Sequence, residues 1–115
     1  MIGIIAAMES EMNAVVSRMT DVKETVIGPA RFAQGRLAGK EAVVGLCGIG
    51  KSAASMTTTI MILEFKPEAV INVGVAGGLL DFQNVCDLVI SDSMIQADFD
   101  TSPLDGPAGI GLQYK

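Results

Sequence analysis

After Met1, the sequence opens with Ile2-Gly3-Ile4-Ile5-Ala6-Ala7-Met8-Glu9-Ser10-Glu11. The apolar, β-branched part of this stretch, Ile2–Ala7, predicts a buried strand. The acidic and hydroxyl side chains at its end predict the start of a helix, because they complement the free N–H groups of a first helical turn. The next apolar residues keep the i, i+3, i+4, i+7 spacing of one helix face; they are Met12, Val15, Val16 and Met19. A strand that leads directly into a helix indicates an α/β fold.

Strand-like and helix-like runs alternate along the rest of the chain. The predicted elements are a hairpin or loop region at Thr25–Leu37 with a turn at Gly28-Pro29, a strand at Glu41–Cys47, a helix at Lys51–Glu64, a strand at Ala69–Val75, and a strand that starts at Asp87–Asp92 and continues towards Gln96. The helix carries almost no charge between its ends, so we expect it to be buried on most sides, and Lys66-Pro67 ends it. After Asp98, prolines and glycines predict a loop. This order predicts a three-layer α/β fold, in which helices flank a central, mostly parallel or mixed sheet with an inserted hairpin.

Size and charge narrow the class of protein. The 115 residues fit one domain, and the 50% hydrophobic content supplies a core. A net charge of −5 without a basic stripe gives nucleic-acid binding no electrostatic support. The sequence contains no histidine, which excludes a histidine-based catalytic triad or a histidine-ligated metal site within this chain, and we predict no metal.

Sequence features of secretion and membrane insertion are also missing. No apolar run reaches the roughly 18 residues that a membrane span needs, and the first residues lack the positive region of a signal peptide. Cys47 and Cys86 lie in apolar runs, so we interpret them as free, buried thiols rather than as a disulfide. We therefore expect a cytoplasmic protein that makes no membrane contact.

The ends of three predicted strands carry the features of interest. Ligands of α/β sheets bind outside the carboxyl ends of the strands, and these ends are Ala7–Glu11, Cys47–Gly50 and Gly74–Gly78. One of these ends carries Glu11 in the first turn of the predicted helix, where the partial positive charge of the helix start favours an ionised carboxylate. On its own, such a carboxylate is better explained as a complement to the helix dipole than as a catalytic group.

One motif near the second strand end allows two interpretations. Gly45–Ser52 matches G-x-x-x-x-G-K-S, the phosphate-binding P-loop, and it lies between a strand and a helix. Against that interpretation, Gly45 falls inside the predicted strand, another strand and helix precede the motif, and 115 residues are few for a complete nucleotide-hydrolase sheet. We favour a close turn with a packing role over a phosphate cradle.

Four segments taken together resemble the methylthioadenosine/S-adenosylhomocysteine nucleosidases of the nucleoside phosphorylase superfamily. The segments are Ile2–Glu11, Gly48–Ala54, Ile71–Leu79 and Asp87–Asp92, and their order and spacing match that family over nearly the whole chain. The resemblance implies a nucleoside phosphorylase-like fold. It also implies hydrolysis of the N-glycosidic bond of methylthioadenosine or S-adenosylhomocysteine, with release of adenine, in methionine salvage.

The resemblance assigns roles to particular residues. Glu11 is implied to be the base that activates water for attack on the ribose, while a second acid protonates the departing purine. The implied substrate-binding residues are Met8, Ile49, Val75, Ala76 and Gly77. Three positions depart from the family, namely Val75 where serine is frequent, Cys86 where glycine is usual, and Ala97 where many relatives have histidine. No cofactor is implied, since water is the only co-reactant.

The resemblance also implies that the chain is incomplete. The family's later Met-Glu pair, which binds ribose, and the Asp that protonates the purine have no counterpart here. Residues 1–115 are therefore predicted to be the N-terminal portion of a single nucleosidase domain, inactive alone and complemented by further polypeptide or by a separate C-terminal half. A homodimer is also implied.

Other members of the superfamily supply the alternatives. These are purine nucleoside phosphorylase, futalosine nucleosidase or AMP nucleosidase activity, and a non-catalytic nucleoside-binding fragment. Phosphorylases hold phosphate with arginines, whereas Arg31 and Arg36 fall in the predicted hairpin and the first strand end carries Glu11. This pattern favours hydrolysis over phosphorolysis.

Overall fold

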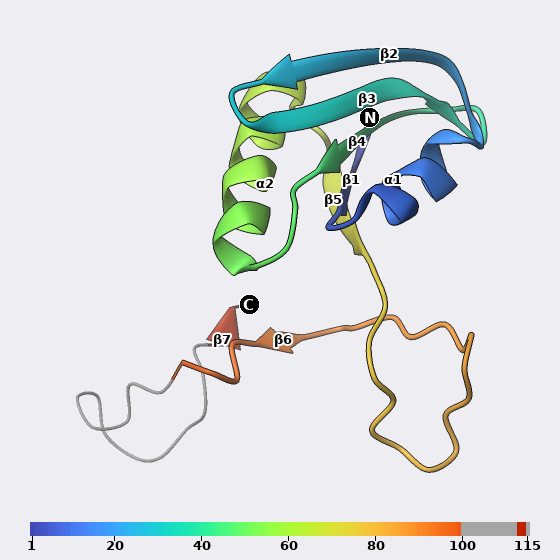
Figure 1. Cartoon of the computed structure of the whole chain (residues 1–115), viewed down its shortest axis with the longest axis vertical. Coiled ribbons are helices and arrows are strands. Elements are labelled where there is room, and N and C mark those ends of the chain that lie inside the picture. Colours follow the sequence, from blue (N-terminus) through green and yellow to red (C-terminus); the bar gives the residue numbers. More distant parts are fainter. Residues whose placement is uncertain (100–112, 115) are drawn as a thin grey trace. The chain divides into compact units, whose positions relative to one another are not determined.

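The computed structural model describes residues 1–99 and 113–114 of the chain. The chain divides into two compact units, Met1–Ala76 and Gly77–Lys115 (Figure 1). The first unit contains a five-stranded sheet, two helices that pack on it, and the two hydrophobic clusters of the core. It therefore positions most of the predicted site residues.

The first unit is built around a mixed sheet. Its elements in chain order are β1 (Ile2–Ala6), α1 (Glu9–Val16), β2 (Met19–Ile27), β3 (Ala30–Leu37), β4 (Lys40–Leu46), α2 (Lys51–Phe65) and β5 (Ala69–Val73). The strands lie in the order β2-β3-β4-β1-β5; β1 runs parallel to β4 and β5, whereas β3 is antiparallel to β2 and β4. The predicted mixed sheet with an inserted hairpin is thus confirmed, and Gly28 stands at the hairpin turn with a φ of +57°.

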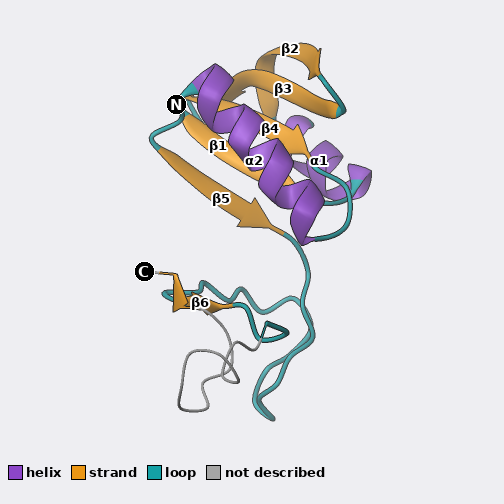
Figure 2. Ribbon diagram, turned by 90° about the vertical axis from the view of Figure 1, so that its left-hand side faces the viewer, coloured by secondary structure: helices purple, strands orange, loops and turns teal. Residues whose placement is uncertain are grey.

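The two helices cover opposite faces of the sheet, which makes three layers as predicted (Figures 1 and 2). Side chains along a strand alternate between its faces, and β1 follows this rule. Ile4 packs in one cluster with Met12 of α1, while its neighbour Ile5 packs in the other with Met61 of α2. The alternation explains why β1 is apolar throughout, since a strand covered on both faces has no solvent side.

One residue assigned to the first helix belongs to a strand instead. The helix ends at Val16, and Met19 begins β2. The backbone N–H groups of Ser17 and Arg18 donate to carbonyl oxygens of the last helical turn, at 2.9 and 3.0 Å, and the chain then leaves the helix. Met19 is nevertheless buried in the same cluster as Met12. The apolar spacing therefore identified the correct face of the sheet but not the type of element.

The second helix was predicted within one residue, but its expected burial is wrong. Thr57 and Met61 are its buried residues, whereas Ile62 and Leu63 are 49% and 68% exposed. One face of the helix packs on the sheet, and nothing in the first unit covers its outer face, which carries Met56, Ile62 and Leu63 beside polar side chains. Its end is as predicted, because Lys66 adopts a left-handed φ of +50°. Within residues 1–99, no helix is both long and apolar enough to cross a membrane.

The second unit contains little regular structure among its described residues. A short strand, β6 (Met94–Ile95), pairs antiparallel with β7 (Gln113–Tyr114). The predicted strand does not form over Asp87–Asp92, and only β6 lies in its predicted continuation towards Gln96. The apolar side chains of Asp87–Asp92 are exposed, with Leu88 at 87% and Ile90 at 84%. No layer packs over them within the unit, and residues 77–99 contain no buried position. Most of the loop predicted after Asp98 lies outside the described residues.

The cysteine prediction is confirmed in one respect and wrong in another. Both Cys47 and Cys86 are free thiols. Cys47 is half-buried and Cys86 is exposed, so neither is the fully buried thiol that its apolar neighbours predicted. Cys86 has a φ of +77° among residues that bury no side chain, and Cys47 lies just beyond the end of β4.

Candidate active site

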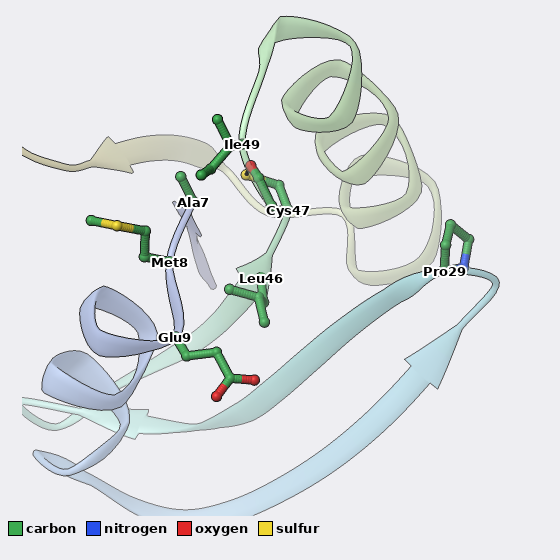
Figure 3. A pocket seen from close by; sticks show the side chains of 8 residues that line it. Ala7, Met8, Glu9, Pro29, Leu46, Cys47 and Ile49 are labelled. Atoms are coloured by element: carbon green, nitrogen blue, oxygen red, sulfur yellow. Dashed lines mark hydrogen bonds between the residues drawn. The ribbon is translucent and has the colours of Figure 1, made fainter.

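The carboxyl ends of β1 and β4 lie next to each other, because the two strands are parallel neighbours with Ala6 opposite Leu46. An open pocket of about 570 Å³ occupies this edge of the sheet (Figure 3). Its lining residues are Ala7, Met8, Glu9, Pro29, Leu46, Cys47, Gly48 and Ile49. Both its size and its place at the carboxyl ends of parallel strands suit a small-molecule site.

Glu11 lies at the same edge, with its carboxylate folded back onto the end of β1. Its Oε2 accepts hydrogen bonds from the backbone N–H groups of Ala7 and Met8, each at 3.0 Å. Met8 is the residue that caps α1, so Glu11, three residues later, makes the reciprocal contact of a capping box. The other oxygen, Oε1, faces the chain beyond β5, because a Cβ placed on Gly74 would lie 3.7 Å from it. One oxygen therefore holds the helix start, and the other faces the end of a neighbouring strand.

Two of the predicted substrate-binding residues, Met8 and Ile49, meet at the pocket although they follow different strands. Met8 is 39% exposed and Ile49 is 85% exposed, so both present apolar surface to the opening (Figure 3). The turn that carries Ile49 is possible because Gly48 and Gly50 adopt φ angles of +77° and +107°. Side chains other than glycine rarely take such angles. The pocket thus has an apolar, thioether-containing wall.

The remaining predicted binding residues follow β5, which ends at Val73 rather than at the predicted Val75. Val75 is 88% exposed and Ala76 is also exposed. Gly77 belongs to the second unit. The pocket lining includes none of these three, so their contacts with a ligand stay predictions.

The first glycine of the P-loop match, Gly45, has a packing role in the structure. Gly45 lies within β4, and a Cβ there would come within 2.9 Å of the Phe32 ring and 3.0 Å of the Met61 methyl carbon. Real Cβ contacts are rarely so short, so glycine is needed for Phe32 and Met61 to pack against the strand. This geometry supports the packing role that the sequence analysis favoured.

The structure adds a charged pair that the sequence analysis missed. The Arg31 Nη2 lies 3.4 Å from the Glu9 Oε1, at the rim where Glu9 lines the pocket. Arg31 reaches this place because it pairs with Leu46, the last residue of β4. Only the register of the hairpin reveals this proximity, and the turn at Gly28-Pro29 was the signal that could have located it. Among the described residues, histidine, cysteine and acidic side chains form no group of three that could hold a metal ion.

Cys47, which also lines the pocket, is a protonated thiol. Burial raises its pKa above the ordinary value, its backbone hydrogen bond lowers it, and the negative charge of Glu11 raises it again. The net direction is upward. At neutral pH the side chain is therefore a weak hydrogen-bond donor and a poor nucleophile.

Comparisons with known proteins agree with the fold of the chain. A family model described as the Phosphorylase superfamily matches residues 1–113. The 5'-methylthioadenosine/S-adenosylhomocysteine nucleosidase of Listeria monocytogenes is 46% identical over 101 residues, which are 88% of this chain and 43% of that protein. The nucleosidase structure from Colwellia psychrerythraea, in complex with adenine, superposes with a TM-score of 0.91 and 37% identity over 96% of this chain and 45% of that one. A futalosine hydrolase mutant of Helicobacter pylori gives a TM-score of 0.85 and 35% identity over 96% of this chain and 48% of that one.

The fold and the strand-end site define an α/β protein of the nucleoside phosphorylase type, and the chain belongs to the phosphorylase superfamily. Within it, the relatives cited above include 5'-methylthioadenosine/S-adenosylhomocysteine nucleosidases, N-glycosyl hydrolases of purine nucleosides. The chain spans less than half the length of these relatives.

Proposed function

We propose that this chain supplies one part of a nucleosidase that hydrolyses the N-glycosidic bond of methylthioadenosine or S-adenosylhomocysteine and releases adenine. The observation that carries the proposal is Glu11, which does not itself line the pocket but whose carboxylate is held by the N–H groups of two lining residues, Ala7 and Met8. The similarity to nucleosidases over most of the chain supports it.

In this proposal, Glu11 is the general base. It takes a proton from water as the water attacks the anomeric carbon of the ribose, and the bond to the purine breaks through an oxocarbenium-like state. The two backbone N–H groups hold the carboxylate in one orientation, which spares the reaction the cost of orienting it. General base catalysis contributes roughly 10²- to 10⁴-fold to such reactions.

The other predicted site residues serve binding. Met8 and Ile49 contact the alkylthio end of the substrate, for which an apolar wall with an adaptable thioether is well suited. Ala76 and Gly77 form the turn under the purine and ribose, and Val75 lines the same site without the hydroxyl that serine would offer to water or ribose. No cofactor takes part, because hydrolysis needs only water and proton donors.

We propose further that residues 1–115 are the N-terminal portion of a single nucleosidase domain. The acid that protonates the purine and the glutamate that binds ribose then come from polypeptide beyond these residues or from a separate C-terminal half. The assembled enzyme is proposed to be a cytoplasmic homodimer that acts in methionine salvage.

Adenine release from methylthioadenosine tests this proposal. The 115-residue chain alone should release no adenine, because a purine is a poor leaving group without a positioned acid. Co-expression with the C-terminal half of a related nucleosidase should restore release. Robust release by the chain alone would contradict the division of the site between two segments. A complex that forms but stays inactive on every purine nucleoside would favour a binding fragment.

Futalosine hydrolysis is the second candidate, because the structural similarity extends to a futalosine hydrolase mutant. The same complemented complex separates the two candidates when the substrates are supplied one at a time. A kcat/KM for futalosine above that for methylthioadenosine would reassign the substrate and leave the role of Glu11 unchanged. A requirement for phosphate would instead indicate phosphorolysis.

A further inference from the structure

Cys47 contacts the end of β1 twice. Its backbone N–H donates to the Ala6 carbonyl oxygen at 2.9 Å, and its Sγ lies 3.2 Å from the same oxygen. The Sγ also lies 3.2 Å from the carbonyl oxygen of Gly48, so its single proton is shared between two acceptors. These contacts attach the first residue after β4 to the last residue of β1.

The carbonyl of Ala6 and the N–H of Ala7 belong to one peptide group. Its oxygen accepts from Cys47, and its N–H donates to the Glu11 Oε2 at 3.0 Å. Hydrogen bonds at both ends of a peptide group polarise and orient it together. The second N–H that holds Glu11, that of Met8, belongs to the next peptide group, whose carbonyl is that of Ala7. Cys47 is thus connected to only one of the two donors.

We propose that Cys47 is a positioning residue for Glu11 and acts through the Ala6–Ala7 peptide group. The catalytic consequence rests on the proposed function, in which Glu11 is the base, whereas the structural coupling does not. The protonation state of Cys47 fits this role, because a thiol can donate to Ala6 only while it keeps its proton, and burial favours that state.

Amide hydrogen exchange in the 115-residue chain tests the coupling. In a Cys86→Ser background, Cys47→Ala removes the thiol donor but keeps the backbone N–H contact. Exchange at the Ala7 amide should rise about threefold, as expected for the loss of one weak hydrogen bond. Cys47→Ser keeps a donor and should return the Ala7 rate to that of the background. The Met8 amide is the internal control and should change little.

Each outcome of the exchange experiment either supports the proposed role of Cys47 or overturns it. A selective, serine-rescued change at Ala7 supports the proposal. Equal acceleration at Ala7 and Met8, or an effect that serine does not rescue, would mean that Cys47 only fills space. An unchanged Ala7 rate in Cys47→Ala would also overturn the proposal.

Kinetics of the complemented enzyme separate this proposal from the proposed function. Cys47→Ala should lower kcat about threefold with little change in KM, and Cys47→Ser should restore it. If the Ala7 amide responds as expected but Glu11→Gln keeps its turnover, the coupling stands and the catalytic assignment of Glu11 falls. If the exchange rate of the Ala7 amide does not change in Cys47→Ala, the proposed coupling between Cys47 and Glu11 is wrong, whatever the activity of the enzyme.

Discussion

Residues 1–76 and residues 77–99 are both rich in apolar side chains, yet only the first region buries them. Phe32, Val43 and Met61 are completely buried in the first region, whereas Leu79 and Val85 are 94% and 95% exposed in the second. The hydrophobic effect rewards burial only where another layer supplies the covering surface. The sheet of the first region has helices on both faces, and residues 77–99 have no such layer within their own unit. Apolar composition alone therefore does not make a core.

The largest expected effect concerns catalysis in the first region. Glu11→Gln should lower kcat of the complemented enzyme by roughly 10²- to 10⁴-fold, because the amide cannot accept the proton of water. The single amide oxygen of glutamine can still accept from the N–H groups of Ala7 and Met8, so the fold should persist. Glu24→Gln, an exposed change on β2, is the matched control and should keep its activity. Near-normal turnover in Glu11→Gln would remove Glu11 from the mechanism.

The next prediction tests the difference in packing between the two regions. Met61→Ala should lower the free energy of unfolding by about 2–5 kcal/mol, because it leaves a cavity between α2 and the sheet. Leu88→Ala, at a position that is 87% exposed, should change it by less than about 0.5 kcal/mol. Urea unfolding followed by circular dichroism measures both. A cost at Leu88 close to that at Met61 would show that the second region packs a core in solution.

Substitutions of one glycine in each region compare the packing of the two regions again, with a smaller expected change in stability. Gly45→Ala should cost about 1–3 kcal/mol, because its methyl group would meet the buried Phe32 ring at 2.9 Å. Gly77→Ala should be close to neutral in stability, since a Cβ there meets nothing within 4 Å. Urea midpoints of the two variants test this pair. A neutral Gly45→Ala would reopen the P-loop interpretation, for which binding of ATP with Mg²⁺ is the assay.

The smallest expected effect compares the two thiols. At pH 8, an alkylating reagent should modify Cys86 several-fold faster than Cys47, because Cys86 is exposed while burial and the charge of Glu11 raise the pKa of Cys47. The raised pKa of Cys47 also makes the free energy of unfolding depend on pH. The contribution of the protonated thiol is complete at pH values below the pKa of Cys47 in the unfolded chain, and it is lost as the pH rises through the pKa of Cys47 in the folded protein. Single-cysteine variants measure the two rates. Glu11→Gln should speed the modification of Cys47, and equal rates for the two thiols would contradict this account.

Local patterns in the sequence determined most elements of the first region. The predicted bounds of β1, β4 and α2 differ from the observed ones by one residue at most. Apolar runs, helix-start carboxylates and a stop before proline act over a few neighbouring residues, so they can be recognised without knowledge of the fold. The same kind of signal placed Glu11 at a helix start and Ile49 in a glycine turn.

Tertiary structure alone decided which surfaces meet. The exposed outer face of α2, the transfer of Met19 to β2 and the missing strand at Asp87–Asp92 all depend on where other layers lie. The ion pair of Arg31 with Glu9 and the contact of Cys47 with Ala6 also depend on the tertiary structure. The partners are separated by 22 and 41 positions in the sequence, and strand register brings them together. Periodicity reports the face on which a residue lies, but not what covers that face, because burial is a property of two surfaces and the local sequence describes only one of them.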